Sequence, residues 1–264
     1  MVDGPVAHVT LRDARRMNAM SRLMWRELRG VFERIAAQPA LRAVLIAGQG
    51  AHFCAGGNIA EYPSFRFDAA SLREFHEIEV WGALRAILSC DVPVLAQIRG
   101  NCMGAGVEIA CCADLRIAAE SAQFGAPIAQ LGFAMAPRET ALLLREAGAV
   151  VTRSMLLEAA VFSAPELLTR GFLTRVVPEC DLDAAVQSTL ARIVGGAPMA
   201  ARRNKQTIRV LNNVLSPVES ALGTPKNGAT SGADILGDQA YAWADSAEHR
   251  EGITAFLAKR KPQF

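Results

Sequence analysis

The stretch Val94–Ala118 reads VLAQIRGNCMGAGVEIACCADLRIA and decides the fold. It begins and ends with runs, Val94–Ile98 and Leu115–Ala118, that are largely apolar and do not alternate, as is typical of strands covered on both faces. Between them a glycine-rich turn, Asn101–Gly106, opens a helix predicted over Val107–Cys112. Strands alternating with helices predict an α/β fold with helices packed outside the strands.

The chain on both sides continues this alternation. Val6–Leu11 and Ala43–Ala47 are further predicted strands. Apolar residues recur at helical spacing between Ser21 and Ala37, with Ser21 as the predicted N-cap. Asp68 heads a long predicted helix, and Ser163–Glu166 has the form of a capping box.

The C-terminal part differs from the rest. From Ala197 onward only helical segments are predicted, and Ser216–Gly237 interrupts them with Pro, Gly, Thr, Ser and Asn, which is typical of an exposed loop. Asp245–Glu248 then caps a final helix that carries Ile253, Phe256 and Leu257. A helical appendage of this kind is expected to pack against a neighbouring segment or subunit.

Composition excludes several classes of function. With 51% hydrophobic and 20% charged residues the chain is an ordinary globular protein, and its net charge of +2 is spread without a basic block, so no nucleic-acid or anionic-membrane partner is expected. No apolar run reaches the ~20 residues that cross a bilayer, and no apolar leader begins the chain. We expect a cytoplasmic protein with reduced, mostly buried cysteines. The four histidines and six cysteines lack metal-ligand spacing, so no metal site is expected.

Two glycine-rich turns are the first candidates for chemistry. Phe53–Ile59 (FCAGGNI) follows one predicted strand, and Asn101–Gly106 follows another. In open α/β sheets ligands bind where strands end and helices begin, and glycine lets a backbone N–H approach a ligand closely. Two such turns meeting at one point would stabilise a developing oxyanion. The alternative is that both are structural turns; neither contains a phosphate-binding or dinucleotide motif.

Glu108 is the second candidate. It lies three residues after Ala105, on the same helix face, among almost wholly apolar neighbours. A carboxyl group there is expected to lose solvation and to have a raised pKa, which suits proton transfer near neutral pH. The alternatives are a glutamate that complements the helix dipole and one that anchors an internal hydrogen bond.

Taken together, these segments resemble the crotonase (enoyl-CoA hydratase/isomerase) family. The resemblance covers nearly the whole chain and is carried by Arg16–Ala19, Phe53–Ile59, Gly100–Asp114, Ala122–Gly125 and Gly252–Pro262. It implies a spiral of ββα units over residues 1–195, followed by a helical oligomerisation region over 196–264 that helps to form a homotrimer or a hexamer.

The resemblance also implies an acyl-CoA site. The substrate would be a CoA thioester, with no permanently bound cofactor, and the peptide N–H groups of Gly57 and Ala105 would hold the thioester oxygen while Glu108 acts as general acid or base. The remaining implied contacts with CoA and the acyl chain are those of Arg16, Ala19, Ala55, Gly56, Ile59 and, from an adjacent subunit, Phe256 and Lys259.

One departure from the family matters for mechanism. Hydratases of this family carry a second glutamate in an F-G-x-P-E turn, where this chain has Phe124–Ile128 and ends the turn on Ile128, which cannot transfer a proton. Glu139, Tyr62 and Glu61 are candidates for a replacement by neighbourhood alone. Arg138, in the altered loop that follows, is a candidate to face an acidic acyl group.

Three hypotheses follow. The first is an enoyl-CoA hydratase/isomerase-like lyase or isomerase that uses Glu108 and the two amides. The second keeps the fold but decarboxylates or hydrolyses an acyl-CoA, which needs the amides and not two glutamates. The third is a non-catalytic acyl-CoA-binding protein, motivated by Ile128.

Overall fold

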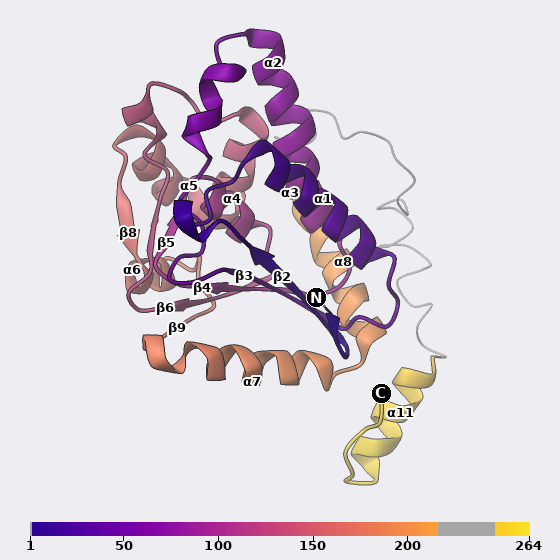
Figure 1. Ribbon diagram of the computed structural model, residues 1–264. Coiled ribbons are helices and arrows are strands. Elements are labelled where there is room, and N and C mark those ends of the chain that lie inside the picture. The colour runs from indigo at the N-terminus through magenta and orange to yellow at the C-terminus, as the bar shows by residue number, and fades with distance from the viewer. Residues whose placement is uncertain (1, 216–245) are drawn as a thin grey trace.

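The computed structural model describes residues 2–215 and 246–264 and has an α/β architecture built on two sheets (Figure 1). The six strands of the main sheet, in spatial order, are β1 (Val2–Asp3), β2 (Val6–Leu11), β3 (Ala43–Gly48), β4 (Val94–Ile98), β6 (Leu115–Ala119) and β9 (Arg175–Val177). All neighbours pair in parallel except β1 and β2. The strands predicted at Val6, Ala43, Val94 and Leu115 are confirmed.

The second sheet is small and adjoins one end of the first. It consists of β5 (Asn101–Met103), β7 (Gln123–Gly125) and β8 (Val161–Ser163). Strand β4 continues into β5 and β6 continues into β7, and each pair of strands is followed by a helix. The units β4–β5–α4 and β6–β7–α5 therefore stack with parallel pairing in both sheets. This is the ββα repeat that the resemblance implied.

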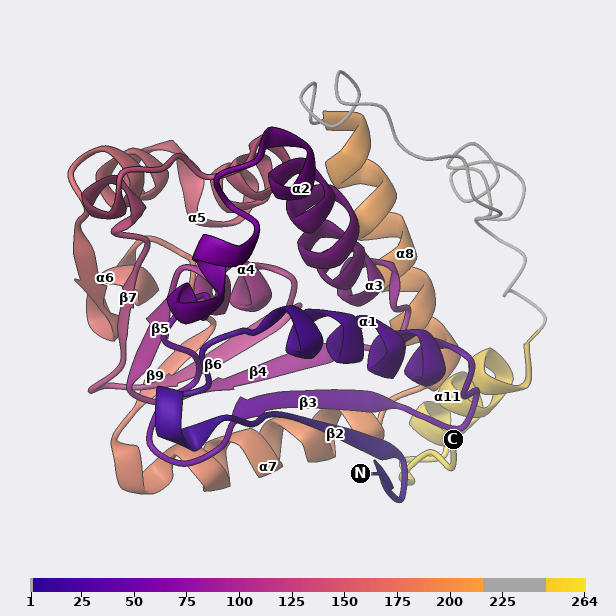
Figure 2. The ribbon, with the colours of Figure 1, turned by 45° about the horizontal axis from the view of Figure 1, so that its top comes forward.

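Nine helices surround the sheets within the described part of the chain. They are α1 (Arg22–Ala36), α2 (Ala69–Glu74), α3 (Trp81–Ser89), α4 (Ala105–Cys111), α5 (Pro137–Leu157), α6 (Ala164–Thr169), α7 (Leu182–Val194), α8 (Pro198–Leu215) and α11 (Ala247–Leu257). Figure 2 shows α7 on one face of the main sheet and α1, α3 and α8 on the other. None of these helices combines the length and apolarity that a bilayer crossing requires.

The two covered faces explain why the central strands do not alternate. In β3, Ala43 and Leu45 pack toward α7, whereas Val44 and Ile46 belong to the larger core on the other side. Both sets are buried. A strand that is covered on both faces must be apolar at every position, and the sequence pattern reflects this directly.

The helix starts were mostly predicted correctly. The Ser21 hydroxyl accepts from the N–H of Met24 at 3.1 Å, and Ser163 forms the capping box with Glu166. Asp68 caps α2, but the long helix that it heads is not uniform, because Phe75–Val80 is a π-helical segment between α2 and α3. Helix α4 begins at Ala105, two residues before the predicted start, so Ala105 lies at its N-terminus.

Helix α8 packs on the core through polar contacts. Lys205 of α8 is buried, and its Nζ donates to Asp114 Oδ2 at 2.6 Å and to the carbonyl of Val92 at 3.0 Å. The predicted final helix is present as α11. The predicted loop over 216–237 and the predicted cap at Asp245 lie outside the described residues.

Candidate active site

The two glycine-rich turns lie against each other. Cys54 and Cys102 form an isolated parallel bridge, with the N–H of Cys54 bonded to the carbonyl of Asn101 at 2.9 Å. A Cβ built on Gly106 would lie 2.7 Å from the carbonyl oxygen of Cys54, closer than real Cβ contacts allow. Glycine at this position therefore lets α4 approach the first turn.

Where these turns meet, two backbone amides have no acceptor within residues 2–215 and 246–264. On either side of Gly57, the carbonyl of Gly56 accepts from the N–H of Met20 and the N–H of Asn58 donates to the carbonyl of Met20, both at 2.8 Å, whereas the N–H of Gly57 finds no acceptor among the described residues. The N–H of Ala105 belongs to the first turn of α4, where no helical acceptor exists. Both residues line the same cavity, of about 240 Å³.

Glu108 lies on α4 and faces this cavity. It is 8% exposed, and within the described part of the chain no group donates a hydrogen bond to its carboxyl. Burial raises the pKa of Glu108 well above its ordinary value, and the negative charge of Glu139 raises it further. The carboxyl is therefore held in its protonated form to a higher pH than a glutamate in water.

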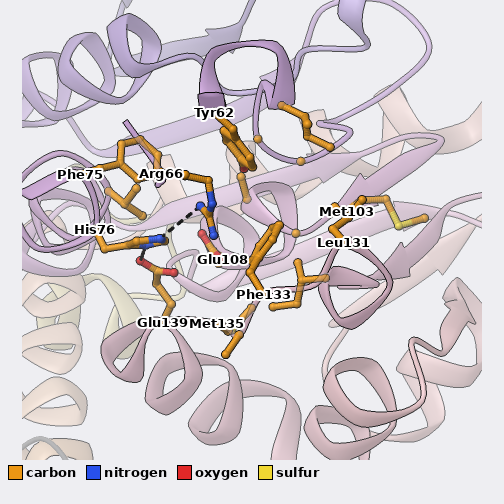
Figure 3. A pocket seen from close by; sticks show the side chains of 18 of the residues that line it. Tyr62, Arg66, Phe75, His76, Met103, Glu108, Leu131, Phe133, Met135 and Glu139 are labelled. Carbon is orange, nitrogen blue, oxygen red and sulfur yellow. Dashed lines mark hydrogen bonds and ion pairs between the residues drawn. The ribbon is translucent and has the colours of Figure 1, made fainter. Parts of the chain in front are cut away.

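Glu139 also lines this cavity. It is 3% exposed and lies in the first turn of α5, where the helix dipole favours a negative charge. Its Oε1 lies 2.7 Å from Nδ1 of His76, which comes from the π-helical segment. Figure 3 shows the side chains of Glu108, His76 and Glu139 directed toward one space. The cavity thus contains two carboxyl groups in different environments.

Two aromatic rings and the guanidinium of Arg66 form another part of the cavity wall. The guanidinium of Arg66 lies 3.9 Å from the ring centroid of Phe133 and 4.5 Å from that of Tyr62. The Tyr62 hydroxyl abuts Gly57, because a Cβ built there would overlap it. Burial raises the pKa of Tyr62, a rise that the charge of Arg66 opposes.

Of the residues that the sequence offered as replacements for the missing second glutamate, some line the cavity and one does not. Ile128 lines the cavity, so the position of the usual second glutamate is present but apolar. Glu139 and Tyr62 also line it. Glu61 does not; its carboxylate accepts from the N–H of Arg22 at 2.9 Å and from Asn58 at 3.1 Å. Arg138 has its Nε 2.8 Å from Glu77 and is not among the residues that line this cavity, so its contact with an acyl group stays a prediction.

The implied CoA contacts are only partly gathered here. Ala55, Gly56 and Ile59 line the cavity with Gly57. Arg16 is exposed and pairs with Asp13 at 3.1 Å, and Ala19 is buried beside the first turn; neither lines the cavity. Lys259 is exposed, beyond the end of α11.

The side chain of Phe256 lies outside the described residues. The expected contact of Phe256 and Lys259 concerns an adjacent subunit, so in a single chain it stays a prediction.

Two residues that line the cavity were not predicted from the sequence. His76 and Arg66 belong to no motif and lie in segments of mixed composition. His76 lies in the π-helical segment, which no local sequence pattern predicted. Among the described residues no cluster of three or more potential metal ligands occurs.

Comparisons with known proteins agree with one another. The family model described as Enoyl-CoA hydratase/isomerase matches residues 2–264. A probable enoyl-CoA hydratase of Rhodobacter capsulatus is 32% identical over 98% of this chain and 94% of its own length. A crotonyl-CoA hydratase of Syntrophomonas wolfei is 31% identical over 94% of this chain and 90% of its own. A crystal structure of an enoyl-CoA hydratase/carnithine racemase from Magnetospirillum magneticum superposes with a TM-score of 0.86 at 35% identity, covering 100% of this chain and 93% of that one.

Proposed function

Because the chain belongs to the enoyl-CoA hydratase/isomerase family and is an enzyme of that type, we propose that it adds water to the double bond of an enoyl-CoA. The thioester oxygen binds between the N–H groups of Gly57 and Ala105. Ala55, Gly56 and Ile59 line the path of the acyl group and the adjoining part of CoA. Negative charge that develops on the oxygen is stabilised there by two donors that need no rearrangement, each contributing on the order of 10²–10³ in rate.

The observation that carries the proposal is that Glu108 and Glu139 line the same cavity, close enough for the charge of Glu139 to act on Glu108. Two carboxyl groups that share a site resist ionising together, so one keeps its proton. Glu108 is buried without a donor, which favours its neutral form. Glu139 lies 2.7 Å from Nδ1 of His76 and in the first turn of α5, and we assign it the role of the base. An acid and a base are thus available at the same pH.

The proposed reaction uses Glu139 as the base and Glu108 as the acid. Glu139 takes a proton from water as the water oxygen bonds to the β-carbon of the enoyl group. The electrons of the double bond move to the thioester oxygen and form the enolate between the two amides. The enolate then takes the proton of Glu108 at the α-carbon. Proton exchange with solvent resets the two carboxyl groups.

Glu139 also removes the reason for the non-catalytic alternative. That alternative rested on Ile128, which lacks a carboxyl, and a second carboxyl enters the same cavity from α5. Decarboxylation or thioester hydrolysis on the same amides stays open as a second reaction class, and product masses separate the three reactions.

The contacts with the rest of CoA are proposed from the family resemblance. Arg16 and Ala19 would lie beside CoA outside the cavity. Phe256 and Lys259 would approach it from a neighbouring subunit of a homotrimer or a dimer of trimers. The boundary near residue 195, between the core and the region that forms these contacts, is part of the same proposal.

The test is turnover of a panel of enoyl-CoAs, read by mass spectrometry, with wild type, Glu108→Gln and Glu139→Gln. Each variant is expected to lose about 10²–10⁴ in kcat, the usual contribution of a general acid or base. Glu33→Gln, an exposed glutamate paired with Arg29, is the matched control and should keep full activity. Full activity in either cavity variant would remove that residue from the mechanism. Loss of carbon dioxide or release of free CoA would instead favour the second reaction class.

A further inference from the structure

Arg66 places a positive charge in the cavity wall. It follows the short 3₁₀ helix Ile59–Ser64 and is half-buried. Its guanidinium carbon lies 4.5 Å from the ring centroid of Tyr62 and 3.9 Å from that of Phe133. Rings that pack against a guanidinium hold its orientation and leave its N–H edge available to a ligand.

This charge has no anionic partner in the protein. Within residues 2–215 and 246–264 no carboxylate lies within ion-pair distance of Arg66. Its one side-chain polar contact is from Nη1 to Nε2 of His76 at 3.5 Å, and the other ring nitrogen of His76 is engaged with Glu139. A guanidinium carries five N–H donors, so most of them are unused. Partial burial of an unpaired cation is costly, and a bound anion would offset that cost.

The position of Arg66 suits the acyl end of a substrate. The Tyr62 hydroxyl abuts Gly57, and the Tyr62 ring faces Arg66. A ligand with its thioester oxygen at Gly57 would therefore bring the far end of a short acyl chain near Arg66, along one phenol ring. Figure 3 shows the Arg66 side chain entering the space between Tyr62, Glu108 and Phe133.

We propose that the acyl group of the substrate ends in a carboxylate, and that Arg66 binds it and determines specificity for short dicarboxylic enoyl-CoAs. This inference rests on the proposed function, because it takes the thioester to lie at Gly57. A carboxylate matches the planar donors of a guanidinium, which binds it through two parallel hydrogen bonds. Arg138 does not compete for this role, since it is paired with Glu77 outside the cavity.

Saturated acyl-CoAs test the inference without any turnover. Glutaryl-CoA and pentanoyl-CoA have acyl chains of the same length and differ in the terminal carboxylate, and neither has a double bond to hydrate. Wild type is expected to bind glutaryl-CoA about ten- to a hundredfold more tightly by calorimetry. In Arg66→Met the ratio of the two affinities should fall to about one. Arg73→Met, an exposed arginine on α2, is the matched control and should keep the wild-type ratio.

Two results would overturn the inference. One is equal affinity of wild type for the two ligands, which decides the matter even if Arg66→Met does not fold. The other is an unchanged ratio in Arg66→Met with both affinities lowered, which would assign Arg66 to the part of CoA that all thioesters share. A turnover assay with glutaconyl-CoA and 2-pentenoyl-CoA then tests the reaction separately: tight glutaryl-CoA binding without hydration of either would contradict the proposed function alone.

Discussion

Nδ1 of His76 lies 2.7 Å from Oε1 of Glu139, and this contact joins the π-helical segment Phe75–Val80 to the first turn of α5. His76 lies on this segment and lines the cavity. π-Helical turns frequently occur at functional sites, where they direct one side chain inward. Here the side chain so directed holds the carboxylate that we propose as the base.

His76 is predicted to act by positioning Glu139. His76→Ala should lower kcat by about 10²-fold, since displacement of a reacting group by one ångström has effects of this size. His76→Asn keeps a donor near Nδ1 and should recover most of the loss in kcat, with KM nearly constant throughout. An equal loss in both variants would instead indicate a packing role for the imidazole.

Glu108 is predicted to make stability depend on pH. Its ordinary pKa is 4.5 and burial raises the value in the folded state, so above pH 4.5 the native protein keeps a proton that the unfolded chain has lost. The free energy of unfolding therefore falls as pH rises from 4.5 toward the folded pKa, by about 1.36 kcal/mol per pH unit from this group. Glu108→Gln lacks this titration.

The measurement is the difference in unfolding free energy between Glu108→Gln and wild type over a pH series. This difference should grow in favour of the glutamine variant as pH rises, and level off above the folded pKa. Glu33→Gln, at the surface, should show a difference that does not follow this trend. A constant difference for Glu108→Gln would contradict the raised pKa.

Gly57→Ala is predicted to remove activity and stability together. The new Cβ would overlap the Tyr62 hydroxyl, and overpacking of this kind costs about 1–3 kcal/mol. Tyr62→Phe in the same chain removes the hydroxyl and should restore part of the stability, which a double-mutant cycle would measure. Gly30→Ala, inside α1, is the control and should be neutral or slightly stabilising. Additive effects in the cycle would argue against the contact.

Gly106→Ala is predicted to separate the two turns. Its Cβ would lie 2.7 Å from the carbonyl oxygen of Cys54, and neither backbone can move without displacing the cavity wall. We expect a loss of about 1–3 kcal/mol in thermal unfolding. The ratio kcat/KM should fall by more than the folded fraction accounts for. Full activity of the folded variant would show that the spacing of the turns is not critical.

Lys205→Met is predicted to loosen α8 from the core. It removes the contacts of Nζ with Asp114 and Val92, and leaves Asp114 with its bond from the N–H of Val94 at 2.7 Å. Because Asp114 is partly exposed, the expected loss in denaturant unfolding is about 1–3 kcal/mol, below that of a fully buried pair. Lys261→Met, at an exposed position, should change little.

Local sequence was sufficient for the strands and the turns. Val94–Ile98 and Ala43–Ala47 are largely apolar because helices cover both faces of the main sheet, so burial on both faces accounts for the sequence pattern. The glycines of Phe53–Ile59 and Asn101–Gly106 mark close backbone approach, which a short segment also records. Glu108 stood out because its helix is otherwise apolar.

Tertiary structure alone decided the rest of the site. Glu139 and Ile128 are both near the altered turn in sequence, and only the path of α5 brings the carboxyl of Glu139 into the cavity. Arg138, its neighbour, turns away to Glu77 because successive residues of a helix point in different directions. Arg66 and His76 meet Glu139 across segments that are distant in sequence, and no local pattern encodes such a meeting. The sequence by itself determined the fold and the two candidate amides, since those depend on burial and backbone geometry near each residue; which charged groups line the cavity was decided by packing between distant segments.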